Sequence, residues 1–233
     1  MLDRFKPWLH RRPDAVVSFP KSGRTWLRVM LDECNIRLLY THAGAEHKTS
    51  VHFGELNTLE AESLGRIVFL YRDPRDTAVS GYYQVARRLG GYPGTISDFI
   101  RDPRHGVAKI LHYNAMWLDL AKTRPHVLVI RYEDMQADAS AVLSRVVEFL
   151  GRAAERAAIE ATVENNTFEK MRERERSGDY RAQYGDILLP ADPGDPNSFK
   201  VRRGQVANYR DELSAEDIAY CDAVSASFVE AYA

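Results

Sequence analysis

Three short runs of consecutive apolar residues stand out from a mixed hydrophobic and polar pattern. They span residues 15–19, 67–71 and 127–130, are rich in β-branched side chains and are bounded by polar or turn residues. Consecutive apolar residues, rather than alternating ones, are typical of strands that are covered on both faces in a parallel sheet. We therefore predict three buried parallel strands.

Helical periodicity occupies much of the chain between and after these runs. Apolar residues recur at helical spacing over residues 26–38, with charged side chains on the opposite face. A second apolar stripe covers residues 143–150 and is followed by Gly151, which favours a helix C-terminus. Ser214 and Asp217 are spaced as a capping pair and predict the start of the last helix.

Strands and helices alternate along the chain, and this order predicts an α/β fold with a central parallel sheet flanked by helices. A chain of 233 residues can bury one sizeable core, so we expect a single domain over residues 1–233. Residues 177–199 are rich in glycine and proline. We interpret them as a long surface loop, because too little chain follows for a second domain.

Composition excludes some functions. The chain has 32 Lys and Arg against 33 Asp and Glu, with a formal net charge of −1. This balance argues against a basic nucleic-acid-binding protein but allows a local basic pocket. Cys34 and Cys221 lack metal or redox spacing and predict free thiols. No run reaches the roughly 18 apolar residues of a spanning helix, and no secretory signal is recognisable. We expect a cytoplasmic protein.

The sharpest motif is P-K-S-G-R-T-W, at residues 20–26, which joins the first predicted strand to a helix. The free N–H groups and positive end of a helix N-terminus suit an anionic ligand. Gly23 allows close approach of the backbone, Lys21 supplies a cation, and Ser22 and Thr25 supply hydroxyls. The lysine precedes the only glycine, so the turn is not a P-loop. An ordinary turn with a solvated Lys21 is the alternative.

A second cationic motif, R-D-P-R-D-T-A-V-S, follows the second predicted strand at residues 72–80. Arg72 leaves the end of the strand, and Ser80 lies on the helix that follows. The two side chains can converge on one phosphate, with the arginine as a charge-assisted fork and the serine as a hydroxyl donor. A surface ion pair between Arg72 and Asp76 is the alternative.

These motifs resemble those of sulfotransferases that use 3′-phosphoadenosine 5′-phosphosulfate (PAPS). The family's 5′-phosphosulfate loop is P-K-[ST]-G-x-[ST]-W, and its 3′-phosphate motif is R-[DN]-P-x-D-x-x-x-S. Three later segments resemble the family motifs Y-E-D-M, [TS]-F-x-x-M and F-x-R-K-G-x-x-G-D-W-K, in order, at residues 131–135, 167–171 and 199–210. Five segments in the same order cover most of the chain. The resemblance implies the P-loop-kinase-like sulfotransferase fold.

The resemblance also implies a site for PAPS and for its product, 3′,5′-ADP. Tyr132 and the segment with Phe168 and Met171 would meet the adenine, and the last segment would close over the 3′-phosphate. The substitution of A-N-Y for G-D-W at residues 207–209 predicts an altered turn and aromatic lid. The implied cofactor-binding residues are Lys21, Ser22, Gly23, Arg24, Thr25, Trp26, Arg72, Ser80, Tyr132, Phe168, Met171, Arg202, Arg203 and Gly204.

Sulfuryl transfer needs a cation for the leaving phosphate and a base for the proton of the acceptor. Lys21 is the candidate for the first task. The resemblance implies a histidine or glutamate base between the first helix and the second predicted strand. Residues 39–42, L-Y-T-H, resemble the family's K-T-H element, so His42 is the candidate base and Glu46 the runner-up. The acids near the turn form no compact ligand set, so we expect no metal.

The sequence does not identify the acceptor of the sulfuryl group. The resemblance implies a hydroxyl or amine on a carbohydrate, a glycolipid, or a small phenol or alcohol. Residues 40–55, 82–92 and 177–199 carry tyrosines that suit such acceptors. Because the chain is short for the family, we expect an open acceptor site. A magnesium-dependent nucleotide kinase and a non-catalytic nucleotide-binding protein are the alternatives, and the oligomeric state is open.

Overall fold

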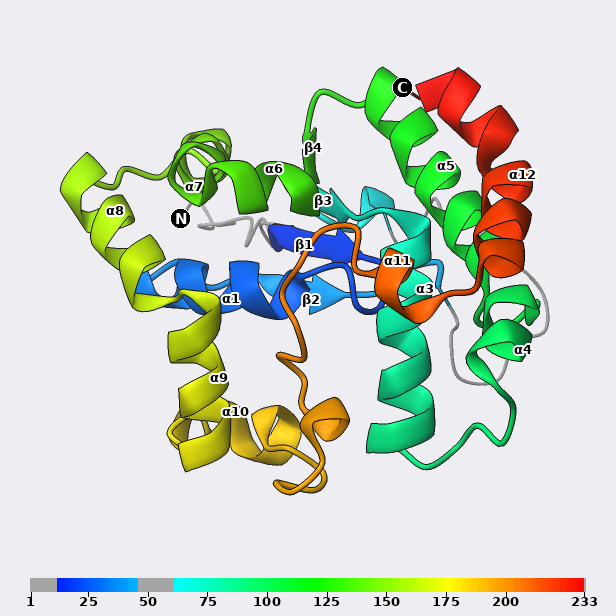
Figure 1. Cartoon of the computed structure of the whole chain (residues 1–233). Helices are drawn as coiled ribbons and strands as arrows, with labels where there is room; N and C mark the ends of the chain where they lie inside the picture. Colours follow the sequence, from blue (N-terminus) through cyan, green and yellow to red (C-terminus); the bar gives the residue numbers. More distant parts are fainter. Residues whose placement is uncertain (1–11, 46–60, 233) are drawn as a thin grey trace, which may run out of the picture.

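The computed structural model describes residues 12–45 and 61–232, which form a parallel sheet with helices on both faces (Figure 1). The sheet has four strands in the order β2-β1-β3-β4. The strands are β1 (Ala15–Ser18), β2 (Leu39–Thr41), β3 (Ile67–Tyr71) and β4 (Val127–Arg131). The three predicted strands are confirmed. The edge strand β2 was missed, because three half-buried or exposed residues are too few to form a pattern.

Helices fill the intervals between the strands and the whole C-terminal half of the described chain. Among the described residues, no helix is both long enough and apolar enough to cross a membrane. The helices are α1 (Arg24–Glu33), α3 (Pro74–Tyr83), η1 (Gln84–Arg88), α4 (Ile96–Arg101), α5 (Val107–Thr123), α6 (Tyr132–Ala137), α7 (Ala139–Phe149), α8 (Arg156–Asn165), α9 (Phe168–Ser177), α10 (Arg181–Tyr184), η2 (Gly185–Leu188), η3 (Pro196–Ser198), α11 (Tyr209–Glu212) and α12 (Ala215–Tyr232).

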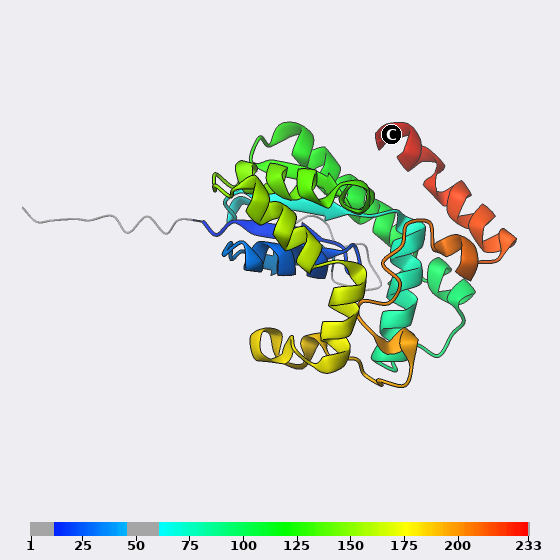
Figure 2. The same cartoon turned by 60° about the vertical axis from the view of Figure 1, so that its left-hand side comes forward.

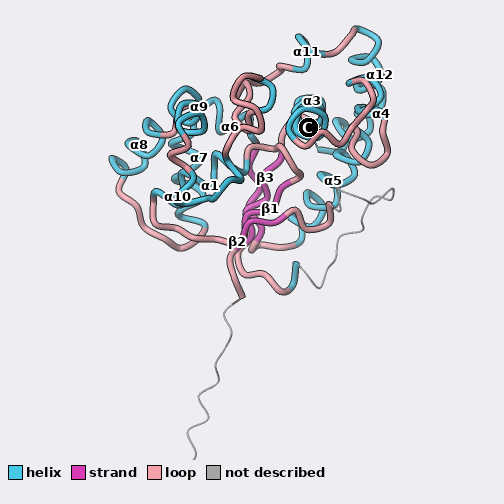
Figure 3. The backbone as a smooth tube through the Cα atoms, turned by 90° about the horizontal axis from the view of Figure 1, so that it is seen from below, coloured by secondary structure: helices cyan, strands magenta, loops and turns pink. Residues whose placement is uncertain are grey.

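The two faces of the sheet have separate hydrophobic cores. Val17 and Phe69 point into a core shared with α3, α5 and α12, whereas Val16 and Leu70 point into one shared with α1, α6 and α7. Figure 3 shows α1 and α6–α10 on one side of the strands, and α3, α4, α5 and α12 on the other. The central strands β1 and β3 are buried on both faces, which explains their consecutive apolar residues.

Local signals placed several helix ends correctly. Gly151 follows α7 in the left-handed conformation, with φ 65°, as its sequence position predicted. The Ser214 hydroxyl accepts a hydrogen bond from the Asp217 N–H at 3.1 Å, at the start of α12. The first helix is shorter than predicted. It ends at Glu33, because Asn35 turns the chain through the left-handed conformation (φ 57°) towards β2.

Residues 177–199, predicted as a long surface loop, are largely exposed but are not irregular throughout. This segment forms α10, η2 and η3, and its residues Tyr180, Tyr184 and Leu188 are buried against Val29 of α1 and Met171 of α9. Together α9 and α10 extend away from the sheet (Figures 1 and 2). The tyrosines therefore build a small third core rather than an open surface.

Candidate active site

The turn between β1 and α1 holds two residues in the left-handed conformation, Lys21 (φ 72°) and Gly23 (φ 98°). A non-glycine residue pays about 1–2 kcal/mol for this conformation, and such strain is typical of functional sites. Gly23 is required for a second reason, because a Cβ there would lie 2.4 Å from Cδ2 of Tyr132. The turn is therefore shaped by backbone strain and by close packing on Tyr132.

The ammonium of Lys21 lies inside the protein rather than in solvent. Its Nζ donates to Oε1 of Gln84 and to the carbonyl of Lys200, both at 3.3 Å. Burial lowers the pKa of Lys21 to about 7, and the charges of Lys200 and Arg88 act in the same direction. A solvated lysine, the alternative considered above, does not fit this environment. An anion beside Lys21 would restore its full charge.

Arg72, at the end of β3, is buried and directed towards the closing segment. Its Nη2 donates to the carbonyl of Gln205 at 2.6 Å and lies 3.3 Å from Oδ2 of Asp76. The guanidinium lies over the ring of Tyr132, 4.3 Å from its centroid. The pair with Asp76 exists but is buried, with Arg72 8% and Asp76 2% exposed. Nε of Arg72 is buried without a hydrogen-bond partner, so a phosphate oxygen fits there.

Asp76 fixes the segment that precedes α11. Its two carboxylate oxygens accept hydrogen bonds from the backbone N–H groups of Ala207 and Tyr209, each at 2.9 Å. Ala207 is held in the left-handed conformation, with φ 59°. The left-handed turn is thus present even though alanine stands where the family has glycine. Tyr209 is buried and lies under the guanidinium of Arg75, which is 4.2 Å from the ring centroid.

An aromatic wall joins the turn to α6. The rings of Trp26 and Tyr132 are in edge-to-face contact, with centroids 6.0 Å apart. Trp26 Nε1 donates to the carbonyl of Asn166 at 2.9 Å, which ties α1 to the end of α8. Met171 is 3% exposed and packs with Val29 and the ring of Trp26 in the small third core.

The closing segment carries Arg202, Arg203 and Gly204. Gly204 has φ 63°, and a Cβ there would lie 2.4 Å from Cδ2 of Phe168. Nη1 of Arg202 donates to Glu212 at 2.7 Å, and Nη2 of Arg203 lies 3.2 Å from the same carboxylate oxygen. Figure 1 shows this part of the chain running between α9 and α3 to reach α11. Both arginines are therefore paired with Glu212 in this structure.

The three hydroxyl residues of the predicted phosphate sites lie on or next to two helices. Ser22 is buried in the turn, and Thr25 is half-buried in the first turn of α1. Ser80 is half-buried in the second turn of α3, the helix that begins two residues after Arg72. Their sequence positions placed them at the two strand-to-helix junctions, and the structure has both junctions at the carboxyl edge of the sheet.

His42 directly follows β2 and lies against the end of β1. Its Nδ1 is 2.6 Å from the carbonyl oxygen of Ser18, and its Nε2 is 2.8 Å from Nη2 of Arg24. A carbonyl can only accept and a guanidinium can only donate, so the proton is on Nδ1 and Nε2 carries the lone pair. Glu46, the other candidate base, lies outside the described residues.

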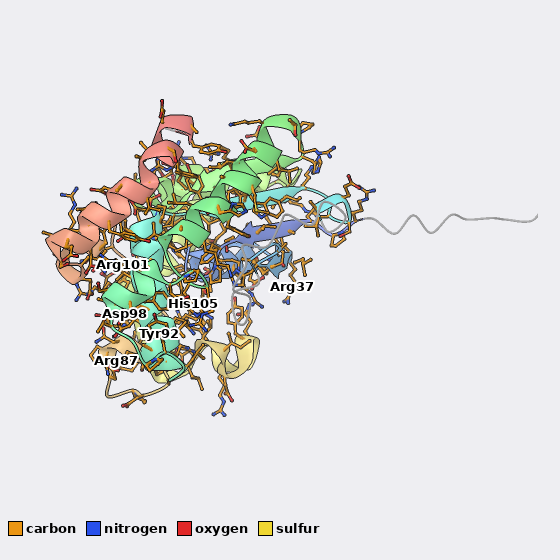
Figure 4. All side chains as sticks on the ribbon, turned by 90° about the vertical axis from the view of Figure 1, so that its right-hand side faces the viewer. Arg37, Arg87, Tyr92, Asp98, Arg101 and His105 are labelled. Carbon is orange, nitrogen blue, oxygen red and sulfur yellow. The ribbon has the colours of Figure 1, made fainter. Side chains whose placement is uncertain are left out.

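Figure 4 shows Tyr92 and His105 next to α4, in the region where tyrosines were expected to line the acceptor site. Phe99 lies between them, with ring centroids 5.0 Å from Tyr92 and 5.1 Å from His105. Tyr82 also contacts Phe99, at 5.7 Å. These rings pack on one another, so much of their surface is used to hold α3 and α4 together.

Sequence reasoning missed several residues of the site. Asp76 lies inside the R-D-P-R-D motif, where it was considered only as an ion-pair partner, and Lys200 lies inside the last motif without an assigned role. Gln84, the partner of Lys21, is in the π-helix η1 and has no local signal. Glu212 also has no local sequence signal. Within the described residues, no three His, Cys, Asp or Glu side chains are grouped as a metal site would require.

A parallel sheet with a cationic turn and the buried Arg72 at its carboxyl edge is typical of a protein that binds a phosphorylated ligand. Residues 35–231 match the family model described as the sulfotransferase domain, which covers most of the chain. The chain therefore belongs to the sulfotransferase family and is an enzyme of that class. The turn at residues 20–26 lies before the matched region.

Known proteins agree with this assignment. Mouse sulfotransferase 1A1 is 24% identical, over 95% of this chain and 85% of its own length. Rat sulfotransferase 1A1 is 26% identical, over 74% of this chain and 70% of its own. Two solved structures share the fold: mouse sulfotransferase SULT7A1 complexed with PAP (TM-score 0.67, 18% identity, 92% of this chain and 82% of that one) and retinol dehydratase with androsterone and the inactive cofactor PAP (TM-score 0.69, 18%, 92% and 79%).

Proposed function

We propose that the protein transfers the sulfuryl group of PAPS to a hydroxyl group, or an amine, of a small-molecule acceptor. One observation carries this proposal. The ring of Tyr132 contacts Gly23 of the first motif and the guanidinium of Arg72 of the second. Two segments about fifty residues apart, each resembling a phosphate-binding motif, therefore meet at one aromatic ring. The PAP in the structures of SULT7A1 and retinol dehydratase supports the same ligand class.

The described residues fit PAPS at both of its charged ends. The turn at residues 21–26 would hold the 5′-phosphosulfate through Lys21 and backbone N–H groups. Arg72, with its unpartnered Nε, would hold the 3′-phosphate together with Ser80 and the two arginines of the closing segment. Trp26, Tyr132, Phe168 and Met171 would provide the apolar surface for the adenine. When the 3′-phosphate binds, Arg202 and Arg203 would give up part of their contact with Glu212 and contact the phosphate instead.

Lys21 and His42 divide the chemistry between them. PAPS supplies a sulfuryl group on a phosphate oxygen, and its S–O bond to that oxygen breaks as the bond from sulfur to the acceptor oxygen forms. Lys21 stabilises the negative charge that develops on the phosphate. Nε2 of His42 takes the proton of the acceptor hydroxyl, since its lone pair is available once Arg24 moves away.

The acceptor is a small molecule rather than a macromolecule in this proposal. Retinol dehydratase has been solved with androsterone and with retinol, and both are small alcohols. A carbohydrate or glycolipid headgroup presents the same hydroxyl chemistry.

The test combines a screen of hydroxyl acceptors with labelled PAPS and calorimetry with 3′,5′-ADP. Lys21→Met should lower kcat about 100-fold or more, because it removes the cation at the leaving phosphate. Lys122→Met, at an exposed position of α5, should leave activity unchanged. Transfer should also continue in the presence of a metal chelator. Absence of 3′,5′-ADP binding, or full turnover by Lys21→Met, would overturn the proposal.

A further inference from the structure

Lys200 and the three arginines whose charges act on it form what we call the cation cluster: Arg24, Arg28, Arg88 and Lys200. Arg24 and Arg28 are on α1, Arg88 is at the end of η1, and Lys200 follows η3. The positive charges of Arg88, Arg24 and Arg28 act on the ammonium of Lys200, and those of Lys200 and Arg88 act on Lys21. Burial and these charges lower the pKa of Lys200 to about 8.

Arg88 has structural partners for both of its terminal nitrogens. Arg88 lies 3.5 Å from the carboxylate of Glu175 and donates to the carbonyls of Ser198 at 3.2 Å and Ile187 at 2.8 Å. Glu175, which is 1% exposed, also accepts the backbone N–H of Lys200 at 2.5 Å. Arg88 and Glu175 thus hold the chain on either side of η3, and neither needs a ligand.

The remaining members have donors without partners. In the part of the chain that the structure describes, the only hydrogen bonds of Lys200 are made by its backbone, so its ammonium is unpaired. Nη1 of Arg24 is buried and has no partner. Nε of Arg28 also lacks a hydrogen bond and is 3.6 Å from Asp32. Buried or half-buried cationic donors without acceptors are costly, so they indicate an anionic ligand.

Arg28 is held in place by aromatic rings rather than by solvent. Its guanidinium lies 5.0 Å from the ring centroid of Tyr40 and 4.8 Å from that of Tyr184. The hydroxyl of Tyr184 donates to Asp32 at 2.8 Å, which fixes this ring in turn. A guanidinium fixed between two rings is preorganised to bind an oxyanion.

PAPS alone does not balance this charge. Lys21 and the cation cluster contribute five positive charges, and among the described residues Asp32 and Glu175 contribute two negative ones. The phosphosulfate of PAPS carries two negative charges and would leave one positive charge unmatched. In the proposed function the 3′-phosphate faces Arg72, Arg202 and Arg203, at the other end of the nucleotide.

From this excess and these unpaired donors, we propose that the acceptor itself carries an oxyanion, a carboxylate, sulfate ester or phosphate ester, which binds Arg24, Arg28 and Lys200. The inference rests on the proposed function and narrows its acceptor class. Arg24 donates to the lone pair of His42 Nε2 in this structure. An oxyanion that draws Arg24 away removes the hydrogen bond from Arg24 to that lone pair, so that Nε2 can take the acceptor proton. Binding of the correct acceptor thus activates the base.

The test compares acceptors that differ only in an anionic group. One pair is 4-hydroxybenzoate and its methyl ester, and a second is 4-nitrophenyl β-glucuronide and its methyl ester. Wild-type enzyme should favour the anionic member by about tenfold or more in kcat/KM, since a hydrogen bond to a charged group contributes about 1.5–3 kcal/mol. The two pairs distinguish a phenolic from a sugar acceptor.

Lys200→Met and Arg28→Met should each bring the ratio of anionic to neutral acceptor close to one. Lys122→Met, the matched surface control, should keep the wild-type ratio. Calorimetry of the same compounds with the complex of enzyme and 3′,5′-ADP gives a readout that needs no turnover. Tighter binding of the anionic member, lost in Lys200→Met, supports the proposal.

Two results would overturn it. The first is equal use and equal binding of anionic and neutral members by the wild type. The second is a Lys200→Met variant whose KM for PAPS rises equally with every acceptor, because the cluster then serves only the phosphosulfate. In both cases 3′,5′-ADP still binds and sulfuryl transfer still occurs, so the proposed function stands. If 3′,5′-ADP does not bind, the proposed function fails and this inference fails with it.

Discussion

Three features of Lys21 disfavour the charged form of its side chain unless an anion is bound. Its backbone is left-handed, its side chain is buried, and the nearest ionised groups include Lys200 and Arg88. Gln84 and the carbonyl of Lys200 accept its hydrogen bonds at 3.3 Å, which is long for a charged donor. A bound phosphosulfate would supply a shorter, charged acceptor, so ligand binding relieves costs that the free protein carries.

The pKa of Lys21 therefore predicts a pH dependence of ligand binding. The free protein has a pKa of about 7 at this residue, and a bound anion raises it, so binding above pH 7 takes up a proton. The phosphates of 3′,5′-ADP are largely ionised in this range. Affinity for 3′,5′-ADP should fall about fivefold from pH 7 to pH 8. Calorimetry in two buffers of different ionisation enthalpy measures the affinity and the proton uptake.

Lys21→Met is the control for this dependence. The variant should bind more weakly at pH 7 and should lose most of the slope between pH 7 and 8. A wild-type affinity that stays constant over this range would contradict the assignment of the slope to Lys21. So would a slope that Lys21→Met retains in full.

At the level of elements, α3 connects the two predicted halves of the 3′-phosphate site. Arg72 precedes this helix, and Asp76 in its first turn accepts the backbone N–H groups of Ala207 and Tyr209. The carbonyl of Gln205 accepts a hydrogen bond from Arg72 in return. The strand end and the closing segment are thus held by reciprocal bonds, although about 130 residues separate them.

Asp76→Asn should disturb this connection while keeping the shape of the side chain. An amide has one acceptor oxygen where two are needed, and its NH₂ group would face a backbone N–H. The KM for PAPS should rise about tenfold with a smaller change in kcat, and the free energy of unfolding should fall by about 1–3 kcal/mol. Steady-state kinetics and denaturant unfolding measure the two effects.

Asp119→Asn, at a surface pair on α5, is the matched control and should change neither quantity. If Asp76→Asn destabilises the fold but leaves the KM for PAPS unchanged, the residue is only structural. An equal loss in kcat and kcat/KM would also contradict a role in positioning the phosphate site.

At the level of the whole molecule, the carboxyl edge of the sheet brings distant segments to one place. Tyr132, at the start of α6, contacts the turn after β1 and Arg72 at the end of β3, and Phe168, at the start of α9, lies against Gly204 of the closing segment. A ligand bound at this edge would contact several of these elements at once. The free energy of binding then adds to the stability of the fold.

Saturating 3′,5′-ADP should therefore raise the melting temperature. A ligand at 100 times its Kd stabilises the folded state by about 2.7 kcal/mol, which corresponds to roughly 5–10 °C for a chain of this size. Differential scanning fluorimetry measures the shift. At the same concentration, 5′-AMP, which lacks the 3′-phosphate, should give a clearly smaller shift. Equal shifts for the two nucleotides would show that Arg72 and the closing segment do not contact the 3′-phosphate.

The sequence by itself determined three of the four strands, the ends of several helices and the order of five motifs. These features depend on residues close together in the chain: consecutive apolar residues, Gly151 after α7, Ser214 before α12, and a lysine, a glycine and a helix start within seven residues. Burial of both sheet faces and the geometry of a helix end constrain residues that are close together in the chain. A short sequence pattern therefore predicts them.

Only the tertiary structure decided which side chains meet. The tautomer of His42 depends on Ser18 and Arg24, and the bonds of Asp76 depend on residues more than 130 positions away. The pairing of Arg202 with Glu212 and the unpaired ammonium of Lys200 have no local signature either. The net charge of −1 is a sum over the whole chain and does not show where charges of one sign lie together. Charge interactions depend on distance in space, so only the fold could bring Arg88 and Lys200 to the turn that carries Lys21.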